Sequence, residues 1–217
     1  MNYLENILNI IYPPVCGFCN EINNNYLCIN CLKKFNQFKI STIDKYNISN
    51  FYFKEHFYLF KYENEIRKKI INYKFNENSH LYKTFSQIFK HDLTFKKFLS
   101  NYDCILSVPI HKKRKYIRGY NQSKLIAKDI GIHLKKPYYD DVLFKTTNIV
   151  AQSTLSKESR QTNVINAFTV QNCEKIANKK VILFDDIFTT GATTNECSKI
   201  LIANGATQIG IVTIAKD

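Results

Sequence analysis

The sequence contains little arginine and no long hydrophobic run. Of its 31 basic residues, 27 are Lys and only four are Arg. The longest apolar stretches, such as residues 7–15, are interrupted and fall far short of the roughly 20 residues that a membrane-spanning helix needs. We therefore expect no integral membrane insertion. The N-terminal stretch lacks a basic segment and contains Glu5, which argues against a secretory signal peptide and favours a cytoplasmic protein.

The charge balance is strongly basic, with 31 Lys and Arg against 18 Asp and Glu, a formal net charge of +13 over 217 residues. Such a charge favours a nucleic acid or another anionic ligand as partner. Because Lys, Ile and Asn are all abundant, as an AT-rich genome would produce, much of this charge reflects composition. Hydrophobic residues make up 45% of the chain, which is enough to bury a core and excludes wholesale disorder.

Seven cysteines exclude complete pairing in intramolecular disulfides, and four of them form two CxxC pairs, CGFC and CINC. Two such turns separated by a short hairpin supply the four thiolates of a tetrahedral zinc site and leave no open position. This spacing predicts a structural metal site rather than a catalytic one. The alternatives are a redox dithiol pair or two disulfides. The four candidate ligands are Cys16, Cys19, Cys28 and Cys31.

Hydrophobic spacing predicts the elements of the first hundred residues. Residues 2–11 are expected to form a short amphipathic helix. Residues 41–50 are polar without periodicity, as in a connection, and the aromatic-rich residues 51–62 suit a strand or a hairpin. Helical spacing then covers residues 63–75 and 79–93.

After residue 101 the pattern changes to short apolar runs that alternate with helical segments. The runs at 102–109 and 180–185 have the composition of buried parallel strands, and a basic loop is expected between Pro109 and Gln122. Strands that alternate with helices of 10 to 15 residues indicate βαβ units, so the predicted class is α/β with a central, mostly parallel sheet flanked by helices. The other expected elements are helices at 122–135 and 193–203 and strands at 142–145 and 207–214.

The segment VILFDDIFTTGATT, residues 181–194, joins a buried strand to a helix through small polar residues. Asp185 and Asp186 lie at the end of that strand. Small residues let backbone amides approach an anion closely, and the start of the following helix adds its positive dipole end. The segment is neither a Walker loop nor a Rossmann fingerprint. The candidate anion-binding residues are Thr189, Thr190, Gly191, Ala192 and Thr193.

The two adjacent carboxylates would repel a bare phosphate, so they should face hydroxyl groups or a metal ion. A ligand with a phosphate at one end and a diol nearby satisfies both halves of the segment. A phosphorylated ribose has this form. The alternative is an Asp-Asp turn cap followed by an ordinary helix start.

Four segments together resemble a known family. The run DDIFTTGAT is similar to the phosphoribosyl pyrophosphate (PRPP) signature of type I phosphoribosyltransferases. With CGFC…CINC, VPIHKKRKYIRGYNQSKLIA and AQSTLSKESRQTNVINAF, the chain resembles the ComF competence family, whose members join a zinc ribbon to a phosphoribosyltransferase-like domain. The resemblance implies a small N-terminal zinc ribbon over residues 1–45 and a type I phosphoribosyltransferase-like domain over residues 46–217.

The resemblance also implies roles for individual residues. Asp185 and Asp186 would bind the ribose hydroxyls, with Mg²⁺ bridging ribose and pyrophosphate oxygens. The turn from Thr189 to Thr193 would hold the 5′-phosphate. Arg118 and Arg160 would join the two carboxylates as catalytic residues.

Two further loops are implied to face the anionic groups of PRPP, the pyrophosphate loop after Pro109 and a mobile loop that closes over the ligand. Three of the four Arg residues lie in these loops, which supports anion binding because a guanidinium group pairs with phosphate oxygens in a bidentate way. Residues 73–75, Tyr-Lys-Phe, also resemble a family element, although such a run is usually a half-buried strand or helix end. The candidate residues of the two loops are Lys112, Lys113, Arg114 and Arg118, then Gln152, Arg160 and Asn163.

The ComF resemblance implies a role in DNA uptake during natural transformation, the import of single-stranded DNA into the cytoplasm, together with binding of PRPP and Mg²⁺. The expected partners are PRPP, single-stranded DNA, a helicase-like protein and other competence proteins. The expected location is the cytoplasm or the inner face of the cytoplasmic membrane. The alternative is an active phosphoribosyltransferase, a glycosyltransferase that passes phosphoribose to an unidentified base or amine, in salvage or as an amidophosphoribosyltransferase. No residue pattern names such an acceptor, so turnover stays open.

Overall fold

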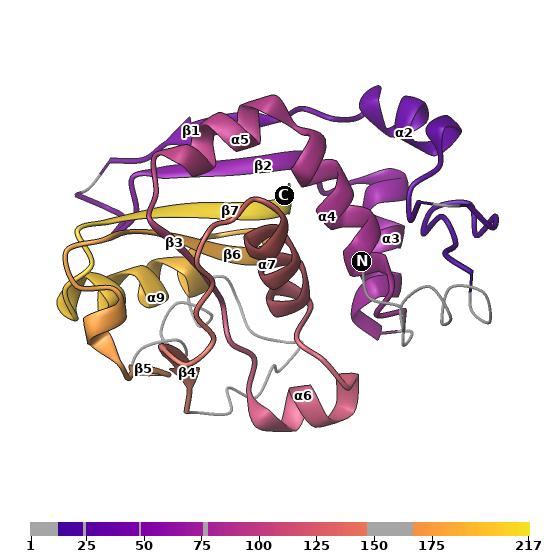
Figure 1. Cartoon of the computed structure of the whole chain (residues 1–217). Helices are drawn as coiled ribbons and strands as arrows, with labels where there is room; N and C mark the ends of the chain where they lie inside the picture. Colours follow the sequence, from indigo (N-terminus) through magenta and orange to yellow (C-terminus); the bar gives the residue numbers. More distant parts are fainter. Residues whose placement is uncertain (1–12, 24, 48, 76–77, 147–166) are drawn as a thin grey trace.

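A five-stranded sheet forms the centre of the protein (Figure 1). The computed structural model describes residues 13–23, 25–47, 49–75, 78–146 and 167–217. In the sheet order β1-β2-β7-β6-β3, the last four strands run parallel and β1 is antiparallel to β2. The predicted mostly parallel central sheet is therefore confirmed. The strands are β1 Thr42–Lys45, β2 Glu55–Lys61, β3 Cys104–Ser107, β6 Lys180–Phe188 and β7 Gln208–Lys216.

Helices flank the sheet and enclose two hydrophobic cores with it. They are α2 Ile29–Asn36, α3 Asn64–Phe75, α4 Leu81–His91, α5 Leu93–Ser100, α6 Lys112–Arg118, α7 Gln122–His133 and α9 Ala192–Ala203. Side chains of α3, α4, α5 and α7 belong to the first core, and side chains of α9 to the second. β6 is buried on both faces, because Ile182 and Phe184 belong to the first core and Val181 and Leu183 to the second.

The segment with the clustered cysteines packs onto the first core. Phe18 stacks on Phe35 with the ring centroids 3.6 Å apart, and its ring meets the Phe85 ring of α4 edge-on at 5.9 Å. The Lys69 ammonium of α3 donates hydrogen bonds to the carbonyl oxygens of Phe18, at 2.7 Å, and of Gly17, at 3.3 Å. The cysteine segment is thus held by both apolar and polar contacts with α3 and α4.

Two expectations for the first half of the chain were wrong. Residues 41–50, expected as a connection, contain the edge strand β1, which pairs with β2 on one side. Because an edge strand is only partly buried, β1 consists mostly of polar residues and has no hydrophobic run that would reveal it in the sequence. Residues 79–93, expected as one helix, contain α4 and the start of α5. The reason is Asp92, whose carboxylate accepts the backbone N–H of Phe95 at 2.7 Å and caps the new helix.

The expected basic loop after Pro109 is also different, because it forms the helix α6. His111 caps this helix by accepting the N–H of Lys113 at 3.2 Å, and Gly119 ends it with a φ of 75°. Lys and Arg are good helix formers, and α6 buries none of its residues. Local propensity and its two caps therefore account for this helix, which projects from the lower edge of the molecule in Figure 1.

The expected strand at 142–145 lies outside the central sheet. It is β4, Leu143–Lys145, and it pairs antiparallel with β5, Phe168–Val170. The helix expected at residues 2–11 lies outside the described residues. The expected helices near 63–75, 122–135 and 193–203 are present as α3, α7 and α9.

Gly210 lies in the middle of β7, where the strand packs closely against Tyr102. A Cβ atom at this position would lie 2.4 Å from the ring and hydroxyl of the buried Tyr102. We predict that Gly210→Ala lowers the free energy of unfolding by about 1–3 kcal/mol, because a rigid buried ring must move. Urea denaturation measures the change, and Thr207→Ala at an exposed position should stay within about 0.5 kcal/mol of wild type. Equal stabilities of the two variants would contradict the prediction.

Candidate functional site

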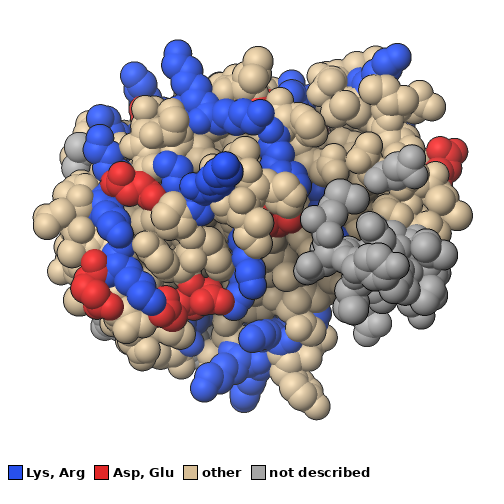
Figure 2. All heavy atoms as spheres, in the orientation of Figure 1, with Lys and Arg blue, Asp and Glu red and all other residues tan. Residues whose placement is uncertain are grey.

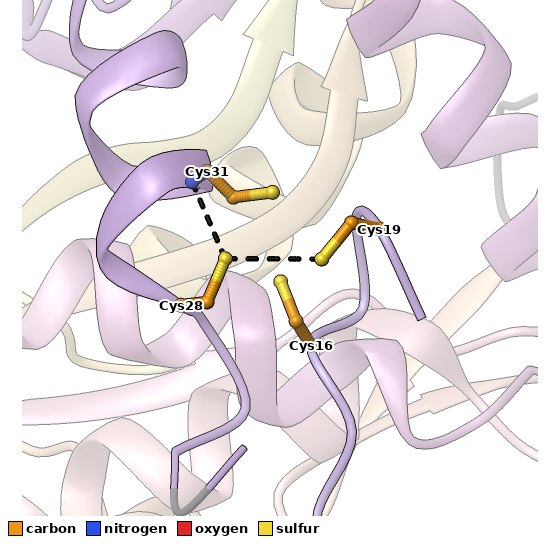
Figure 3. Close-up of side chains that lie close together, drawn as sticks. All are labelled: Cys16, Cys19, Cys28 and Cys31. Carbon is orange, nitrogen blue, oxygen red and sulfur yellow. Dashed lines mark hydrogen bonds between the residues drawn. The ribbon is translucent and has the colours of Figure 1, made fainter. Parts of the chain in front are cut away.

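The four clustered cysteines converge on one point. Figure 3 shows the side chains of Cys16 and Cys19 from one turn pointing toward those of Cys28 and Cys31, and the four Sγ atoms lie within 4.8 Å of one another. The Sγ atoms of Cys19 and Cys28 are 3.7 Å apart. Zn–S bonds of about 2.3 Å in a tetrahedron place sulfurs about 3.8 Å apart, so the four residues fit zinc. The same separation is far longer than the roughly 2.05 Å of a disulfide bond.

The local backbone favours thiolate at this cluster. Cys28 is the N-cap of α2, and its Sγ accepts the N–H of Cys31 at 3.4 Å. Burial alone would raise the pKa of Cys16, but hydrogen bonds from backbone groups of Cys28, Cys19 and Phe18 bring it down to about 7. Burial and the neighbouring sulfurs raise the pKa of Cys31. A bound cation would relieve this conflict, and with four protein ligands it would be structural.

Loss of one cysteine ligand should release the metal and weaken the fold. We predict that the wild-type chain binds one zinc ion at this cluster, and that Cys28→Ser loses it and lowers the melting temperature by roughly 6–12 °C, because about 3 kcal/mol of stability goes with the metal. Metal analysis and thermal unfolding measure the two effects. Cys173→Ser is the matched control, since this exposed thiol lies outside the cluster. Full zinc content in Cys28→Ser would show that the cluster is not the zinc site.

The acidic pair lies within the last four residues of β6, beyond Phe184, where the pairing with β3 ends, while the pairing with β7 continues to Phe188. Asp185 Oδ1 accepts hydrogen bonds from Ser123 Oγ at 3.1 Å and from the backbone N–H of Asp186 at 2.8 Å. Asp186 Oδ2 forms an ion pair with Lys74 Nζ at 2.9 Å. Burial, and next the charge of Asp186, raise the pKa of Asp185 to about 7. The pair is therefore an electrostatically strained group that a ligand can relieve.

The predicted anion-binding turn follows the acidic pair after two further residues of β6, Ile187 and Phe188. Gly191 has a φ of 75° and is the N-cap of α9, and a Cβ there would lie 2.5 Å from the Phe188 ring. The positive φ and the lack of room for a Cβ atom both require glycine at this position. The backbone N–H of Ala192 donates to Thr190 Oγ1 at 3.3 Å. The turn thus presents small residues and the start of a 12-residue helix shortly after two carboxylates.

The basic residues expected after Pro109 lie on α6. Figure 2 shows Lys and Arg gathered at the lower edge of the molecule, where Figure 1 places this helix. Arg118, at its C-terminal end, stacks over the Phe75 ring at 4.9 Å and donates from Nη1 to Gln122 Oε1 at 3.5 Å. Burial lowers the pKa of Arg118, while the nearby Asp186 carboxylate acts in the opposite direction. Lys112 and Arg114 share the helix.

The structure brings together only part of the predicted set. Asp185, Asp186, residues 189–193 and Arg118 are held around the carboxyl end of β6. Lys112, Lys113 and Arg114 lie on α6. Gln152, Arg160 and Asn163 lie outside the described residues.

Comparison with known proteins identifies relatives of this chain. No family model matches it. Competence protein F of Haemophilus influenzae is 31% identical over 115 residues, which make up 52% of this chain and 50% of that protein. Competence protein ComFC of Bacillus subtilis is 30% identical over 120 residues, 54% of this chain and 47% of that protein. Over about half of its length, the chain is therefore similar in sequence to ComF competence proteins.

A third match agrees with the sequence-based resemblance to this family. DNA utilization protein YhgH of Escherichia coli K12 is 30% identical over 109 residues, 50% of this chain and 47% of that protein. This ComF relative spans about half the length of the curated proteins it matches.

Solved structures show a partial likeness. A glutamine PRPP amidotransferase from B. subtilis, complexed with ADP and GMP, covers 61% of this chain and 25% of its own length at 16% identity and a TM-score of 0.41. A hypoxanthine phosphoribosyltransferase from Staphylococcus aureus covers 63% and 65% at 14% identity and a TM-score of 0.40. The strand order, the two cores and the four-cysteine cluster define the fold of this ComF relative.

Sequence patterns missed how the end of α3 reaches the site. Residues 73–75 do form a helix end, as their composition indicated, yet Lys74 pairs with Asp186 and Phe75 lies under Arg118. Ser123, which bonds Asp185, was part of the family-like run but had no assigned role. The sequence signal that could have indicated these contacts was a Lys between two aromatic residues at the end of a helical segment.

The raised pKa of Asp185 predicts a stability that depends on pH. A group that binds its proton more tightly in the folded state stabilises the fold at low pH and loses this contribution as the pH rises from about 4 to about 7. We expect Asp185→Asn to be more stable than wild type at pH 8 by roughly 1–2 kcal/mol, and no more stable at pH 4. Urea unfolding at both pH values tests this. A gain that is the same at both would show that the carboxyl charge is not its cause.

Proposed function

We propose that this ComF relative acts in DNA uptake during natural transformation and that its phosphoribosyltransferase-like domain binds PRPP with Mg²⁺. The observation that carries the second part is the placement of two adjacent carboxylates beside a small-residue turn and a helix start at the carboxyl end of a parallel strand. Open α/β sheets bind ligands at this edge. The printed names of the relatives, which refer to competence and DNA utilization, support the first part.

The chemistry of the site suits a phosphorylated ribose. Asp185 and Asp186 accept hydrogen bonds from the ribose hydroxyls, while residues 189–193 bind the 5′-phosphate through backbone amides and hydroxyl groups. Arg118, with Lys112 and Arg114 on the same helix, supplies positive charge for the pyrophosphate. Oxygen-rich groups of this kind suit Mg²⁺, which would neutralise pyrophosphate charge when it is bound with PRPP.

The proposed cellular role includes import of single-stranded DNA into the cytoplasm, together with a helicase-like partner and other competence proteins. Single-stranded DNA binds surfaces that combine basic and aromatic side chains. The exposed Tyr116 lies on the basic helix α6 and offers such a surface. For this role we propose a location in the cytoplasm or at the inner face of the cytoplasmic membrane. Among the described residues, no helix has the length and apolar character to span a membrane.

A second candidate function is transfer of phosphoribose from PRPP to a base or an amine. The observation in its favour is a hollow of about 500 Å³ beside Arg118, lined in part by three tyrosines. Aromatic rings stack on planar acceptors, and cationic residues stabilise a departing pyrophosphate. The three tyrosines are Tyr82, Tyr116 and Tyr120.

Removing the acidic pair should remove PRPP binding. We predict that the double variant Asp185→Ala, Asp186→Ala shows no detectable heat with PRPP and Mg²⁺ in calorimetry, and that Asp186→Asn weakens binding by roughly 10- to 100-fold. Asp129→Ala is the control, because this carboxylate pairs with Lys90 and lies outside the acidic pair. Unchanged affinity of the double variant would contradict the proposed site.

Two further assays separate the candidate functions. Release of pyrophosphate with a panel of bases and amines would favour transfer. Loss of transformation in the double variant without any such release would favour a role of PRPP binding in DNA uptake. Normal transformation by a double variant that no longer binds PRPP would separate DNA uptake from the PRPP site.

A further inference from the structure

The C-terminal end of α3 is locked onto the segment that precedes and begins α7. The Tyr73 hydroxyl donates to the backbone oxygen of Gln122 at 2.8 Å, and Gln122 Nε2 donates to the backbone oxygen of Lys74 at 3.3 Å. The Tyr120 hydroxyl donates to the backbone oxygen of Tyr73. Tyr73 is fully buried. These bonds join segments 47 to 49 residues apart in sequence and fix the position of the Lys74 backbone.

Lys74 uses this fixed backbone to reach the acidic pair. Its Nζ lies 2.9 Å from Asp186 Oδ2, and the two side chains are 18% and 14% exposed. Removing an ion pair from water costs desolvation energy, so this pair is not expected to contribute much to the free energy of unfolding. Lys90 and Asp129 form a similar pair, 3.0 Å long and 15% and 17% exposed, between α4 and α7. That second pair provides a matched comparison away from the acidic pair.

The acidic pair needs a cation at this position. Asp185 and Asp186 are adjacent, and like charges so close disfavour ionisation of both. The Asp185 carboxylate is compensated by hydrogen bonds from Ser123 and from the Asp186 amide. Lys74 provides a full positive charge at bonding distance from Asp186, while Arg118 and Lys145 act on the pair from farther away.

The same helix end also supports the anion-facing half of the site. Phe75 lies under the Arg118 guanidinium at 4.9 Å. Arg118 in turn bonds Gln122, the residue that receives the Tyr73 hydroxyl. Three successive residues therefore contact the core, the acidic pair and the basic helix α6.

We propose that Lys74 is a positioning residue of the sugar-binding site. Its ammonium holds the Asp186 carboxylate in place through Oδ2, so that the other carboxylate oxygen is oriented to accept a hydrogen bond from a ribose hydroxyl. This proposal rests on the proposed function, since the ligand of the acidic pair is PRPP with Mg²⁺. Residues 73–75 thereby extend the site to a helix that lies more than a hundred residues before the acidic pair in sequence.

Calorimetry with PRPP and Mg²⁺ tests the proposal with three single variants. Lys74→Met should weaken binding about tenfold or more, because it removes the cation that holds Asp186 Oδ2 in place. Lys74→Arg, which keeps the charge, should stay within about threefold of wild type. Lys90→Met, which breaks the comparably buried pair, should bind as wild type. Zinc content and a cooperative thermal transition confirm that each variant is folded.

A second arm asks whether Lys74 acts through Asp186. In an Asp186→Asn background, Lys74→Met should change the affinity by less than about twofold, because the carboxylate it serves is gone. Wild-type affinity in Lys74→Met, or an equal loss in both backgrounds, would overturn the positioning role while leaving PRPP binding intact. Failure of Lys74→Arg to recover binding would also overturn it. Absence of PRPP binding by the wild-type chain would instead overturn the proposed function, and this proposal with it.

Discussion

The structure depends on the burial of β6 on both faces of the sheet. A strand enclosed in this way is filled with apolar side chains, so polar groups can enter only beyond its enclosed part. Val181 to Phe184 fill the two cores, and the polarity changes at Asp185. Because the neighbouring strands β3 and β7 run in the same direction, their carboxyl ends lie at the same edge. The position of the acidic pair follows from this packing.

The price of this position is two adjacent carboxylates in a poorly hydrated place. Groups from three different elements interact favourably with the two carboxylates. They are the Ser123 hydroxyl of α7, the Lys74 ammonium of α3 and the Arg118 guanidinium of α6. Compensation stays incomplete, since the pKa of Asp185 is still raised to about 7. A site under such strain favours a ligand that brings both hydroxyl donors and positive charge.

Features that depend on local sequence could be predicted. The CxxC spacing indicated the sulfur cluster, and the apolar run before Asp185 indicated β6, because both patterns are contiguous. The structure also contains features that arise from contacts distant in sequence. The edge strand β1 has no hydrophobic run, α6 is held by its caps, and the partner of Lys74 lies more than a hundred residues away. Periodicity carries no information about such partners.

Helix α3 contacts both candidate sites at once. Lys69 holds the backbone oxygens of the first cysteine turn, at Gly17 and Phe18, and Lys74 holds Asp186. Five residues of helix span about 7.5 Å and behave as a stiff rod. The position of the cysteine turn and the position of the Lys74 ammonium are therefore both tied to α3. The two proposed ligands, zinc at the cysteine cluster and PRPP at the acidic pair, would therefore lie against residues that are held by one helix.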